Sequence, residues 1–465
     1  MNDPVWIRYY KGGHLEETIT FAAADDRIYK RIQELRDAGI NARDCVIVQM
    51  GNTPDAVVTY MAIYRMNAIV VPVHQKEVPD RFDYMLSHSG ARAIVRPNEI
   101  VRVNSTTSVD VSNLQDICTI IYTSGSTGEP KGVCLSWNNW MANTEALIHH
   151  HEMNGGTVLA SPLPLSHCNA HGLAMLTTFT ARCTLVLFDK MSDNLLDCIS
   201  SEKVTILSIV PSILQRLHGA NPSWKPHVEF KYILTAAAPL KPDLIDEVLR
   251  DWGVRIIQGY GLSESVNFSC TMPIGLSDSE YRSIMFPHPS VGVALEGVHI
   301  RVGEEDKERV PGEVVVRAPS NFYGYFKRDT VSPKEWVSTG DIGYFQTRSG
   351  RRYYYLVGRI KEFINRGGEK ISPFELELEI AKLLPQGETF AVITIPDDEY
   401  GEDVGLACTQ KIDATLFNSI PKYRRPKKIF LMKDLIYASN GKMLRRKIAD
   451  FCNAGNAEMM WQTYE

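Results

Sequence analysis

The sequence lacks the features that mark several large classes of protein. Its nine cysteines form no CxxC pair and no histidine spacing typical of a zinc site. No apolar run approaches the roughly 18 residues that a membrane span needs, and the opening MNDPVWIRYYKGG lacks the charged and then apolar order of a signal peptide. The formal net charge of -5 offers no general attraction to nucleic acid or to an anionic membrane. We therefore expect a cytoplasmic chain in a reducing compartment, with no membrane span and no nucleic-acid partner.

The composition of the chain, and the alternation of strand and helix patterns along it, are typical of an α/β enzyme. Its 465 residues, 44% hydrophobic and 23% charged, suit two or three globular domains. Through the first two thirds, short β-branched runs alternate with helical patterns, which predicts βαβ units and parallel sheet. The clearest expected strands are 45–48, 69–73, 184–188, 204–210 and 254–258.

Other segments predict different local structure. Residues 242–250 predict a helix with a proline in its first turn and one apolar face. Residues 97–116 are polar and irregular, which favours a loop. Between about 291 and 357, glycine-punctuated runs predict an antiparallel or barrel-like subdomain, and roughly the last hundred residues predict a smaller α+β unit.

The strongest local signal is the segment YTSGSTGEPKG at 122–132. Small residues let backbone N–H groups approach phosphate oxygens, hydroxyl groups donate to them, and Lys131 adds positive charge. The alternatives are a plain glycine and serine surface turn, or a Walker loop. A Walker loop requires glycine where Pro130 stands and serine or threonine where Gly132 stands. The segment therefore predicts a phosphate-binding loop of another kind.

Together with this loop, four further segments resemble the adenylate-forming superfamily of acyl-CoA synthetases (the AMP-dependent synthetase and ligase family), nonribosomal-peptide adenylation domains and firefly-type luciferases. They are QGYGLSES at 258–265, STGD at 338–341, GRIKEFINRGGEKISPFELE at 358–377 and SNGKMLRRK at 439–447. The five segments stand in the family's order and span nearly the whole chain.

The resemblance implies an α/β fold in two mobile parts. A large N-terminal domain at 1–357, with parallel sheets and a barrel-like subdomain, would bind AMP and the acyl group. A hinge at 358–361, with Lys361 as its pivot, would join it to a small mobile C-terminal α+β domain at 362–465 that carries the catalytic lysine.

The resemblance also implies a nucleotide site that requires ATP and Mg2+. Tyr260 is expected to stack on adenine, beside the adenine-wall segment TAAAPL at 235–240. Asp341 is expected to accept the ribose hydroxyls, with Arg359 assisting, and Glu264 to reach the magnesium beside the phosphates. The expected nucleotide contacts are Thr123, Ser124, Gly125, Ser126, Thr127, Gly128, Lys131, Ala237, Gln258, Gly259, Tyr260, Gly261, Ser263, Asp341 and Arg359.

Further residues are expected to serve the chemistry and the acceptor thiol. Lys442 matches the family's catalytic lysine, whose charge stabilises the transition state as pyrophosphate departs. His167 matches the histidine at the acyl pocket, although His171 competes for the same role. Gly367 and Gly368 resemble the glycines that let a pantetheine arm pass close to the backbone.

The whole pattern predicts an ATP-dependent acid:thiol ligase. We expect it to form an acyl-adenylate from a carboxylic acid, release pyrophosphate and pass the acyl group to CoA or to a phosphopantetheinyl carrier protein in trans. The basic segment YRRPKKIF at 423–430 either meets phosphates of that acceptor or is a solvated face. A standalone module that loads one carrier protein and a degenerate nucleotide-binding protein are the rival hypotheses.

The acyl-pocket segment at 164–169 carries no carboxylate. Amino-acid adenylation domains that resemble this family place an aspartate there, where it pairs with the substrate's ammonium group. A buried ammonium without a partner costs several kcal/mol. The sequence therefore predicts a carboxylic acid without a free α-ammonium group, unless Asp189 supplies the missing carboxylate.

Overall fold

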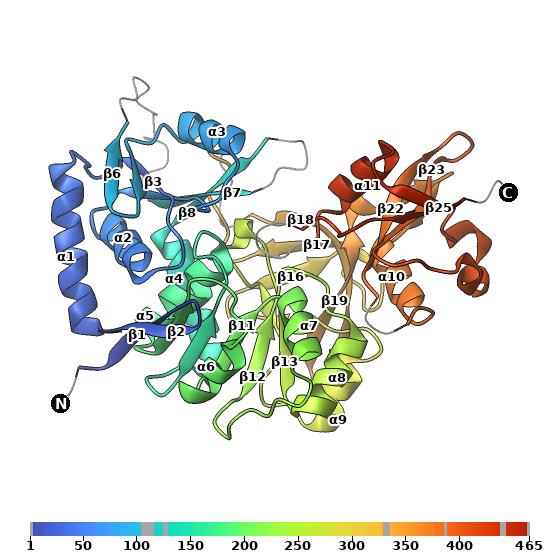
Figure 1. Ribbon diagram of the computed structural model, residues 1–465, viewed down its shortest axis with the longest axis horizontal. Coiled ribbons are helices and arrows are strands. Elements are labelled where there is room, and N and C mark those ends of the chain that lie inside the picture. The colour runs from blue at the N-terminus through green and yellow to red at the C-terminus, as the bar shows by residue number, and fades with distance from the viewer. Residues whose placement is uncertain are drawn as a thin grey trace.

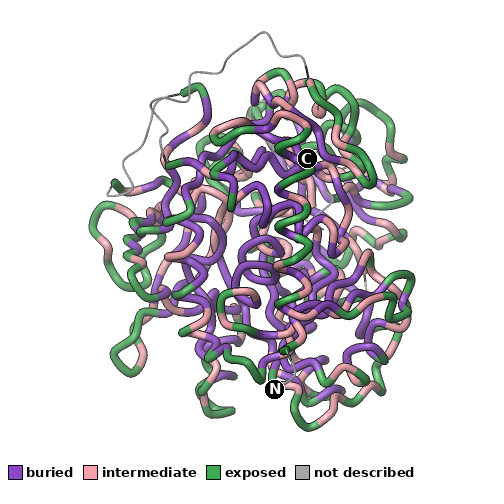
Figure 2. Tube along the Cα trace, turned by 90° about the vertical axis from the view of Figure 1, so that its left-hand side faces the viewer, coloured by how far each residue is buried: buried purple, intermediate pink, exposed green. Residues whose placement is uncertain are grey.

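The structure, a computed structural model, describes residues 3–103, 116–123, 129–328, 335–385, 388–437 and 443–462. Within these ranges the strands form four sheets. In Figure 1 the elements coloured blue to yellow pack together, and the orange to red elements form a lobe at one side of them. The buried residues, purple in Figure 2, run through the interior, and the exposed residues lie on the outer loops and turns.

The largest sheet is mostly parallel. Its strands are Val5–Lys11 (β1), His14–Thr20 (β2), Val158–Ser161 (β9), Thr184–Phe188 (β10), Ile206–Ile209 (β11), Tyr232–Thr235 (β12), Arg255–Tyr260 (β13), Cys270–Thr271 (β14) and Val293–Ala294 (β15). Their order is β15-β14-β13-β12-β11-β9-β10-β1-β2, and each neighbouring pair from β13 to β1 is parallel. The strands predicted at 184–188, 204–210 and 254–258 are confirmed as β10, β11 and β13.

A second sheet carries the segment that leads into the predicted phosphate loop. Its strands are Cys45–Val48 (β3), Ile69–Pro72 (β4), Ala93–Arg96 (β5), Glu99–Arg102 (β6), Ile117–Thr123 (β7) and Lys131–Ser136 (β8). Their order is β6-β5-β3-β4-β7-β8, and β5, β3, β4 and β7 run parallel. The loop predicted at 97–116 is wrong at its start, because β6 pairs antiparallel with β5; residues 104–115 lie outside the described residues.

Helices pack against these sheets and join their strands. They are Phe21–Asp37 (α1), Pro54–Arg65 (α2), Pro79–Ser89 (α3), Trp137–His150 (α4), Thr177–Thr180 (α5), Leu195–Ser201 (α6), Pro211–Ala220 (α7), Pro242–Trp252 (α8), Asp278–Met285 (α9), Pro373–Ala381 (α10) and Arg445–Asn453 (α11), with a π-helix at Asn169–Leu176 (η1). The helix predicted at 242–250 is α8, which buries Leu244, Ile245 and Val248. It ends where Gly253 adopts a left-handed φ of 70°.

The third sheet is antiparallel. It consists of His299–Val302 (β16), Gly312–Arg317 (β17), Val337–Arg348 (β18) and Arg351–Arg359 (β19), in that order. The antiparallel subdomain predicted near 291–357 is therefore confirmed. In the described residues these strands form an open sheet, and β19 continues two residues past the predicted end of the N-terminal domain.

The fourth sheet forms the C-terminal lobe. Its strands are Ile364–Arg366 (β20), Glu369–Ile371 (β21), Phe390–Asp397 (β22), Gly401–Cys408 (β23), Lys428–Leu431 (β24) and Glu458–Gln462 (β25), ordered β21-β20-β23-β24-β25 with β22 pairing β23. With α10 and α11 it makes the predicted α+β unit, so the mixed α/β fold with a C-terminal sheet is confirmed. The boundaries at 357 and 361 stay a prediction.

The C-terminal lobe touches the rest of the chain through side chains. The Lys241 ammonium lies 5.0 Å from the centroid of the Phe390 ring in β22. The His288 and Phe374 ring centroids are 5.6 Å apart. Among the described helices, none combines the length and apolar character that crossing a membrane requires.

Candidate active site

The two ends of the predicted phosphate loop lie side by side. β7 ends at Thr123 and β8 begins at Lys131, and these two residues are register partners in the antiparallel pair. The Thr123 hydroxyl donates to the Lys131 carbonyl at 3.5 Å. Five predicted contacts, Ser124, Gly125, Ser126, Thr127 and Gly128, lie outside the described residues. The loop thus leaves the carboxyl end of a parallel strand, which is where open α/β sheets bind ligands.

Tyr325, which the sequence reasoning missed, links two predicted site residues. Its ring centroid lies 4.9 Å from the Lys131 ammonium, and its hydroxyl donates to the Glu264 carboxylate at 2.8 Å. Tyr325 reaches this position because its segment runs along β8, where Phe326 N–H donates to the Gly132 carbonyl at 2.7 Å. Burial, followed by the charge of Glu264, raises the pKa of Tyr325, so the phenol stays protonated and remains a donor.

A strained turn follows Glu264. Val266 is fully buried and adopts φ 71° and ψ -63°, and the N–H of Asn267 donates to the Ser265 carbonyl at 3.0 Å. These values describe a classical γ-turn, which is rare and costs about 1–3 kcal/mol for a non-glycine residue. Backbone strain of this kind persists only where surrounding contacts hold it and gathers at ligand sites.

Two glycines of the QGYG segment are required by close packing. A Cβ on Gly261 would lie 1.6 Å from the Asn267 carbonyl oxygen, and one on Gly259 would lie 2.8 Å from the Phe268 ring. Their small size therefore lets β13 approach the segment after the γ-turn. Whether either backbone also contacts a nucleotide stays a prediction.

The expected ribose ligand is a buried carboxylate that pairs with a half-exposed arginine. Asp341 in β18 and Arg359 in β19 are direct cross-strand partners, and their side chains meet at 2.8 Å between Arg359 Nε and Asp341 Oδ1. The Tyr260 hydroxyl donates to the other carboxylate oxygen at 2.8 Å. Burial and then the negative charge of Asp341 raise the pKa of Tyr260 well above its usual value. The structure thus brings three predicted residues together, with Tyr260 holding the carboxylate.

Strand β13, which carries Tyr260, and its neighbour β12 carry polar atoms that lack partners among the described residues. Thr235 Oγ1 and Gln258 Oε1 are buried and accept or donate no hydrogen bond among the described residues. They are register partners: Thr235 ends β12, and Gln258 lies two residues before the end of β13. Ala237, just beyond Thr235, adopts a left-handed φ of 70°, which is uncommon for a residue with a Cβ. Buried polar atoms without partners are rare in proteins and call for a ligand or water.

The two histidines of the acyl-pocket segment have different surroundings. His171 lies in the π-helix η1 and is held at both ring nitrogens, by the Tyr64 hydroxyl at 2.6 Å and the Leu165 carbonyl at 3.1 Å. That bonding makes it a structural residue of the buried core. His167 lies just before η1, and burial, followed by the charges of His74 and Arg81, lowers its pKa to about 4. It is therefore neutral near pH 7.

This segment also touches the predicted nucleotide motif. The Cys168 thiol is buried, and burial raises its pKa to about 12 even though a hydrogen bond with the Ser263 side chain lowers it. Cys168 follows His167 directly, and Ser263 precedes Glu264. The hydrogen bond therefore ties the acyl-pocket segment to the segment expected to hold ATP.

The predicted hinge and thiol-tunnel residues follow the ion pair along the chain. Lys361 lies in a short 3-10 turn, Ile360–Glu362 (η3), directly after β19. Gly367 and Gly368 both have left-handed φ values, 56° and 97°. A Cβ on Gly367 would lie 2.9 Å from Tyr400, whereas nothing lies within 4 Å of one on Gly368. Lys442 lies outside the described residues.

Two of the four positive charges of the basic segment 423–430 are paired with carboxylates. Arg424 pairs with Glu379 at 3.0 Å, and Lys427 pairs with Asp397 at 2.5 Å. Arg425 donates to backbone carbonyls, including that of Asn418 at 2.9 Å. Carboxylates therefore oppose two of the four positive charges of the segment, and its contact with acceptor phosphates stays a prediction.

The side chains that could ligate Mg2+ at this site suit an ion that is held mainly by the phosphates of its substrate. Among the described residues no group of three or more His, Cys, Asp or Glu side chains gathers as a metal site. Mg2+ is usually bound through one or two carboxylates, several waters and substrate phosphates. The single Glu264 carboxylate, oriented by Tyr325, fits that pattern.

Comparisons with known proteins agree with the fold and the site. The family model described as AMP-binding enzyme matches residues 3–113 and 102–326. A feruloyl-CoA synthase of Amycolatopsis sp is 27% identical over 477 residues, with 94% of each chain covered. An oxalate–CoA ligase of Arabidopsis thaliana is 26% identical over 488 residues, with 93% of each chain covered.

A solved structure has the same fold at low sequence identity. The o-succinylbenzoate coenzyme A synthetase (MenE) of Bacillus subtilis, in complex with ATP and magnesium ion, superimposes with a TM-score of 0.81 at 20% identity, covering 96% of each chain. Because the family model matches more than half of its residues, the chain belongs to the AMP-binding enzyme family.

Proposed function

We propose that this protein is an ATP-dependent, AMP-forming acid–CoA ligase. The observation that carries the proposal is the Asp341 carboxylate. Each of its oxygens accepts one hydrogen bond, from Arg359 and from Tyr260, and each keeps a lone pair that can accept a ribose hydroxyl. The buried atoms of Thr235 and Gln258, on β12 and on the strand that carries Tyr260, have no partner among the described residues and further support a polar ligand in this part of the fold.

The relatives support the same reaction class. The feruloyl-CoA synthase and the oxalate–CoA ligase each align with more than nine tenths of this chain. Their names describe the joining of a carboxylic acid to CoA. Those two acids differ greatly in size and polarity. The relatives therefore support the type of reaction, and the identity of the carboxylic acid has to be found by experiment.

In the first half-reaction a carboxylate oxygen of the acid attacks the α-phosphorus of ATP. The bond from that phosphorus to the bridging oxygen breaks, and pyrophosphate leaves with the electron pair. Lys131 and Lys442 offset the negative charge that gathers on the phosphates. Magnesium, when bound beside Glu264, would neutralise phosphate charge. His167, neutral near pH 7, can hydrogen-bond the acid without holding it in an ion pair.

In the second half-reaction the CoA sulfur, as thiolate, attacks the acyl carbonyl carbon. The carbon–oxygen bond to the phosphate breaks, AMP leaves, and the thioester forms. Gly368 supports a passage for the pantetheine arm, because a Cβ there would enter open space beside the chain. The alternative acceptor is the pantetheine thiol of a carrier protein, and that reaction would consume no free CoA.

The proposal is tested by measuring pyrophosphate release with a panel of acids. The panel holds ferulate, oxalate, malonate, fatty acids of several lengths and the twenty amino acids, each with and without CoA. We expect one class of acid without an α-ammonium group to drive release and CoA to be converted to its thioester. Preference for an α-amino acid would contradict the substrate prediction, and release without loss of free CoA would favour a carrier protein. Failure of every acid would overturn the proposal.

A further inference from the structure

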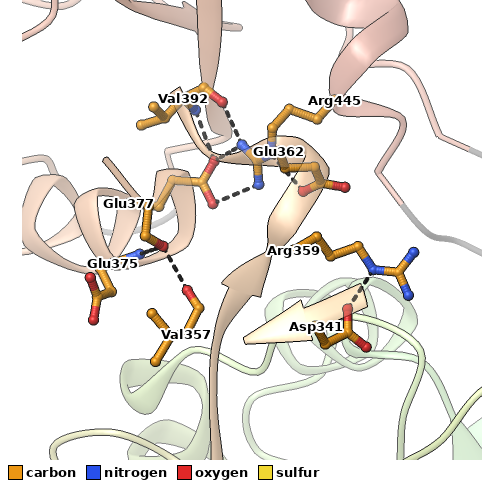
Figure 3. A network of polar contacts seen from close by, with 9 residues as sticks. Asp341, Val357, Arg359, Glu362, Glu375, Glu377, Val392 and Arg445 are labelled. Carbon is orange, nitrogen blue, oxygen red and sulfur yellow. Dashed lines mark hydrogen bonds and ion pairs between the residues drawn. The ribbon is translucent and has the colours of Figure 1, made fainter. Parts of the chain in front are cut away.

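A buried ion network lies at the centre of the C-terminal lobe (Figure 3). The Arg445 guanidinium donates to both carboxylate oxygens of Glu377 and to the Val392 carbonyl. It also meets Glu362 Oε2 at 3.3 Å. The side chains of Arg445 and Glu377 are only 12% and 14% exposed. The Arg445 guanidinium is held in place chiefly by Glu377, because leaving either of these two buried charges unpaired is costly; Glu362 is 36% exposed.

Arg445 stands at the base of the segment that carries Lys442. Tyr437 and Met443, which bracket residues 438–442, pair as an antiparallel bridge. The N–H of Leu444 donates to the Ile436 carbonyl at 2.9 Å. Arg445 is the next residue and begins α11. The backbone from which Lys442 extends is therefore anchored three residues away by the buried network.

The other end of the network lies at the predicted hinge. Glu362 is the last residue of η3 and follows Lys361 directly. Three residues earlier, Arg359 pairs with Asp341, the expected ribose ligand. Figure 3 shows the ion pair of Arg359 with Asp341 below, and the contacts of Arg445 with Glu377 and Glu362 above it. The first side chain after the pivot is thus tied to the base of the lysine segment.

We propose that Arg445 and Glu362 are positioning residues for Lys442, joined as a rigid strut across the C-terminal lobe. The inference rests on the proposed function, in which Lys442 assists adenylation. Without the strut, rotation at Lys361 would move the lobe but leave the lysine segment loosely placed. With it, the backbone angles at the pivot set where the Lys442 ammonium lies. A misplacement of about 1 Å can cost roughly a hundredfold in rate, so such a strut has a measurable effect.

Substituting Arg445 would leave the Glu377 carboxylate buried and unpaired. A substitution at Glu362 tests the link more specifically. Glu362→Ala removes the link between Arg445 and the predicted hinge, together with a negative charge that acts on Arg359, and leaves the contacts of Arg445 with Glu377 and Val392 in place. Glu379→Ala is the matched control, because Glu379 also pairs with an arginine of the same lobe. The two pairs have similar lengths, 3.3 and 3.0 Å, and the two glutamates similar exposure, 36% and 41%.

The first measurement follows the lysine segment without any substrate. Amide hydrogen exchange is measured on the full chain for peptides that cover residues 436–444. We expect faster exchange in Glu362→Ala than in the unmodified chain, and no change in Glu379→Ala. Equal exchange in the two variants would overturn the strut, whatever the enzyme's activity.

The second measurement separates the two half-reactions with the most active acid of the panel. In Glu362→Ala, kcat for pyrophosphate release should fall at least about tenfold with KM for ATP unchanged. Glu362→Gln, which keeps an acceptor oxygen, should lose less. Thioester formation from preformed acyl-adenylate should be unchanged in both. A purely structural role would lower both half-reactions together and would overturn the inference.

The variant Lys442→Ala distinguishes a failure of the proposed strut from a failure of the proposed role of Lys442. If Lys442→Ala abolishes pyrophosphate release while Glu362→Ala behaves like Glu379→Ala, the strut is refuted and the proposed function stands. If Lys442→Ala leaves release intact, the proposed role of Lys442 fails, and the exchange measurement still decides whether the strut exists.

Discussion

Replacing Asp341 by asparagine should weaken ATP binding in a way that depends on the ribose hydroxyls. The amide fits the site, because its oxygen can accept from Arg359 and its nitrogen can donate to the Tyr260 oxygen, so the fold should survive. The ribose contacts, however, change from charged to neutral hydrogen bonds. Each such change loses about 1–1.5 kcal/mol, or about 2–3 kcal/mol for two hydroxyls. KM for ATP should therefore rise about 30-fold to 150-fold.

The assay is a cycle that compares ATP with 2′-deoxy-ATP in the pyrophosphate-release reaction. In the unmodified enzyme, removing one hydroxyl should cost about 1.5–3 kcal/mol, because the lost bond is to a charged group. In Asp341→Asn the same removal should cost only about 0.5–1.5 kcal/mol. Asp306→Asn is the control, since Asp306 also pairs with an arginine of β19, Arg352 at 2.6 Å.

The reasoning is refuted if 2′-deoxy-ATP is penalised equally in the unmodified enzyme and in Asp341→Asn. The ribose 2′-hydroxyl and the Asp341 carboxylate would then contribute independently to binding, and Asp341 would not be the ribose ligand. A similar rise in KM for ATP in Asp306→Asn would show that the effect comes from a general loosening of the sheet.

Three further predictions concern other parts of the chain. Lys442→Ala should lower the adenylation rate by about 10² to 10³ and leave thioester formation from preformed acyl-adenylate intact; equal loss of both would refute its role. Gly368→Leu should keep pyrophosphate release and lose thiol transfer. Gly455 also has a positive φ and open space around a Cβ, so the control Gly455→Leu should lose neither activity. Retained transfer in Gly368→Leu would place the thiol passage elsewhere. Burial lowers the pKa of His171 to about 4, against about 6.5 in the unfolded chain. The unfolded chain therefore binds an extra proton between those values, and the unfolding free energy should drop by about 3 kcal/mol as pH falls through that window. Denaturant titrations of His171→Asn should show a shallower pH dependence, and an unchanged slope would contradict the buried neutral state.

Much of the fold could be predicted because the pattern is local. The strands at 45–48 and 184–188 match β3 and β10 residue for residue, since short β-branched runs between turns have few other solutions. Residues 99–102 were missed because EIVR gains its strand form only by pairing with β5. The antiparallel sheet was found from its glycine-punctuated runs.

The site was predictable in its motifs and not in its tertiary contacts. Tyr325 carries no local signal, because its importance comes from lying beside Lys131 and Glu264, which are distant in sequence. The hydrogen bond between the Tyr64 hydroxyl and the His171 ring was equally hidden, because the two residues are distant in sequence; His167 as the acyl-pocket histidine stays a prediction.

Charge and strain were equally hidden from the sequence. Arg424 and Lys427 of the basic segment 423–430 have carboxylate partners on other elements, which the segment alone does not reveal. The strain at Val266 was also invisible, because valine gives no sign of a positive φ.

The central claim is that a carboxylate attacks the α-phosphorus of ATP. It is tested most directly by giving the enzyme the most active acid labelled with ¹⁸O in both carboxylate oxygens, together with ATP and CoA, and analysing the products by mass spectrometry. We expect one ¹⁸O in AMP, because the oxygen that bridges carbon and phosphorus in the acyl-adenylate leaves with the phosphate when the thioester forms. Unlabelled AMP, or label in inorganic phosphate with ADP as the nucleotide product, would contradict it.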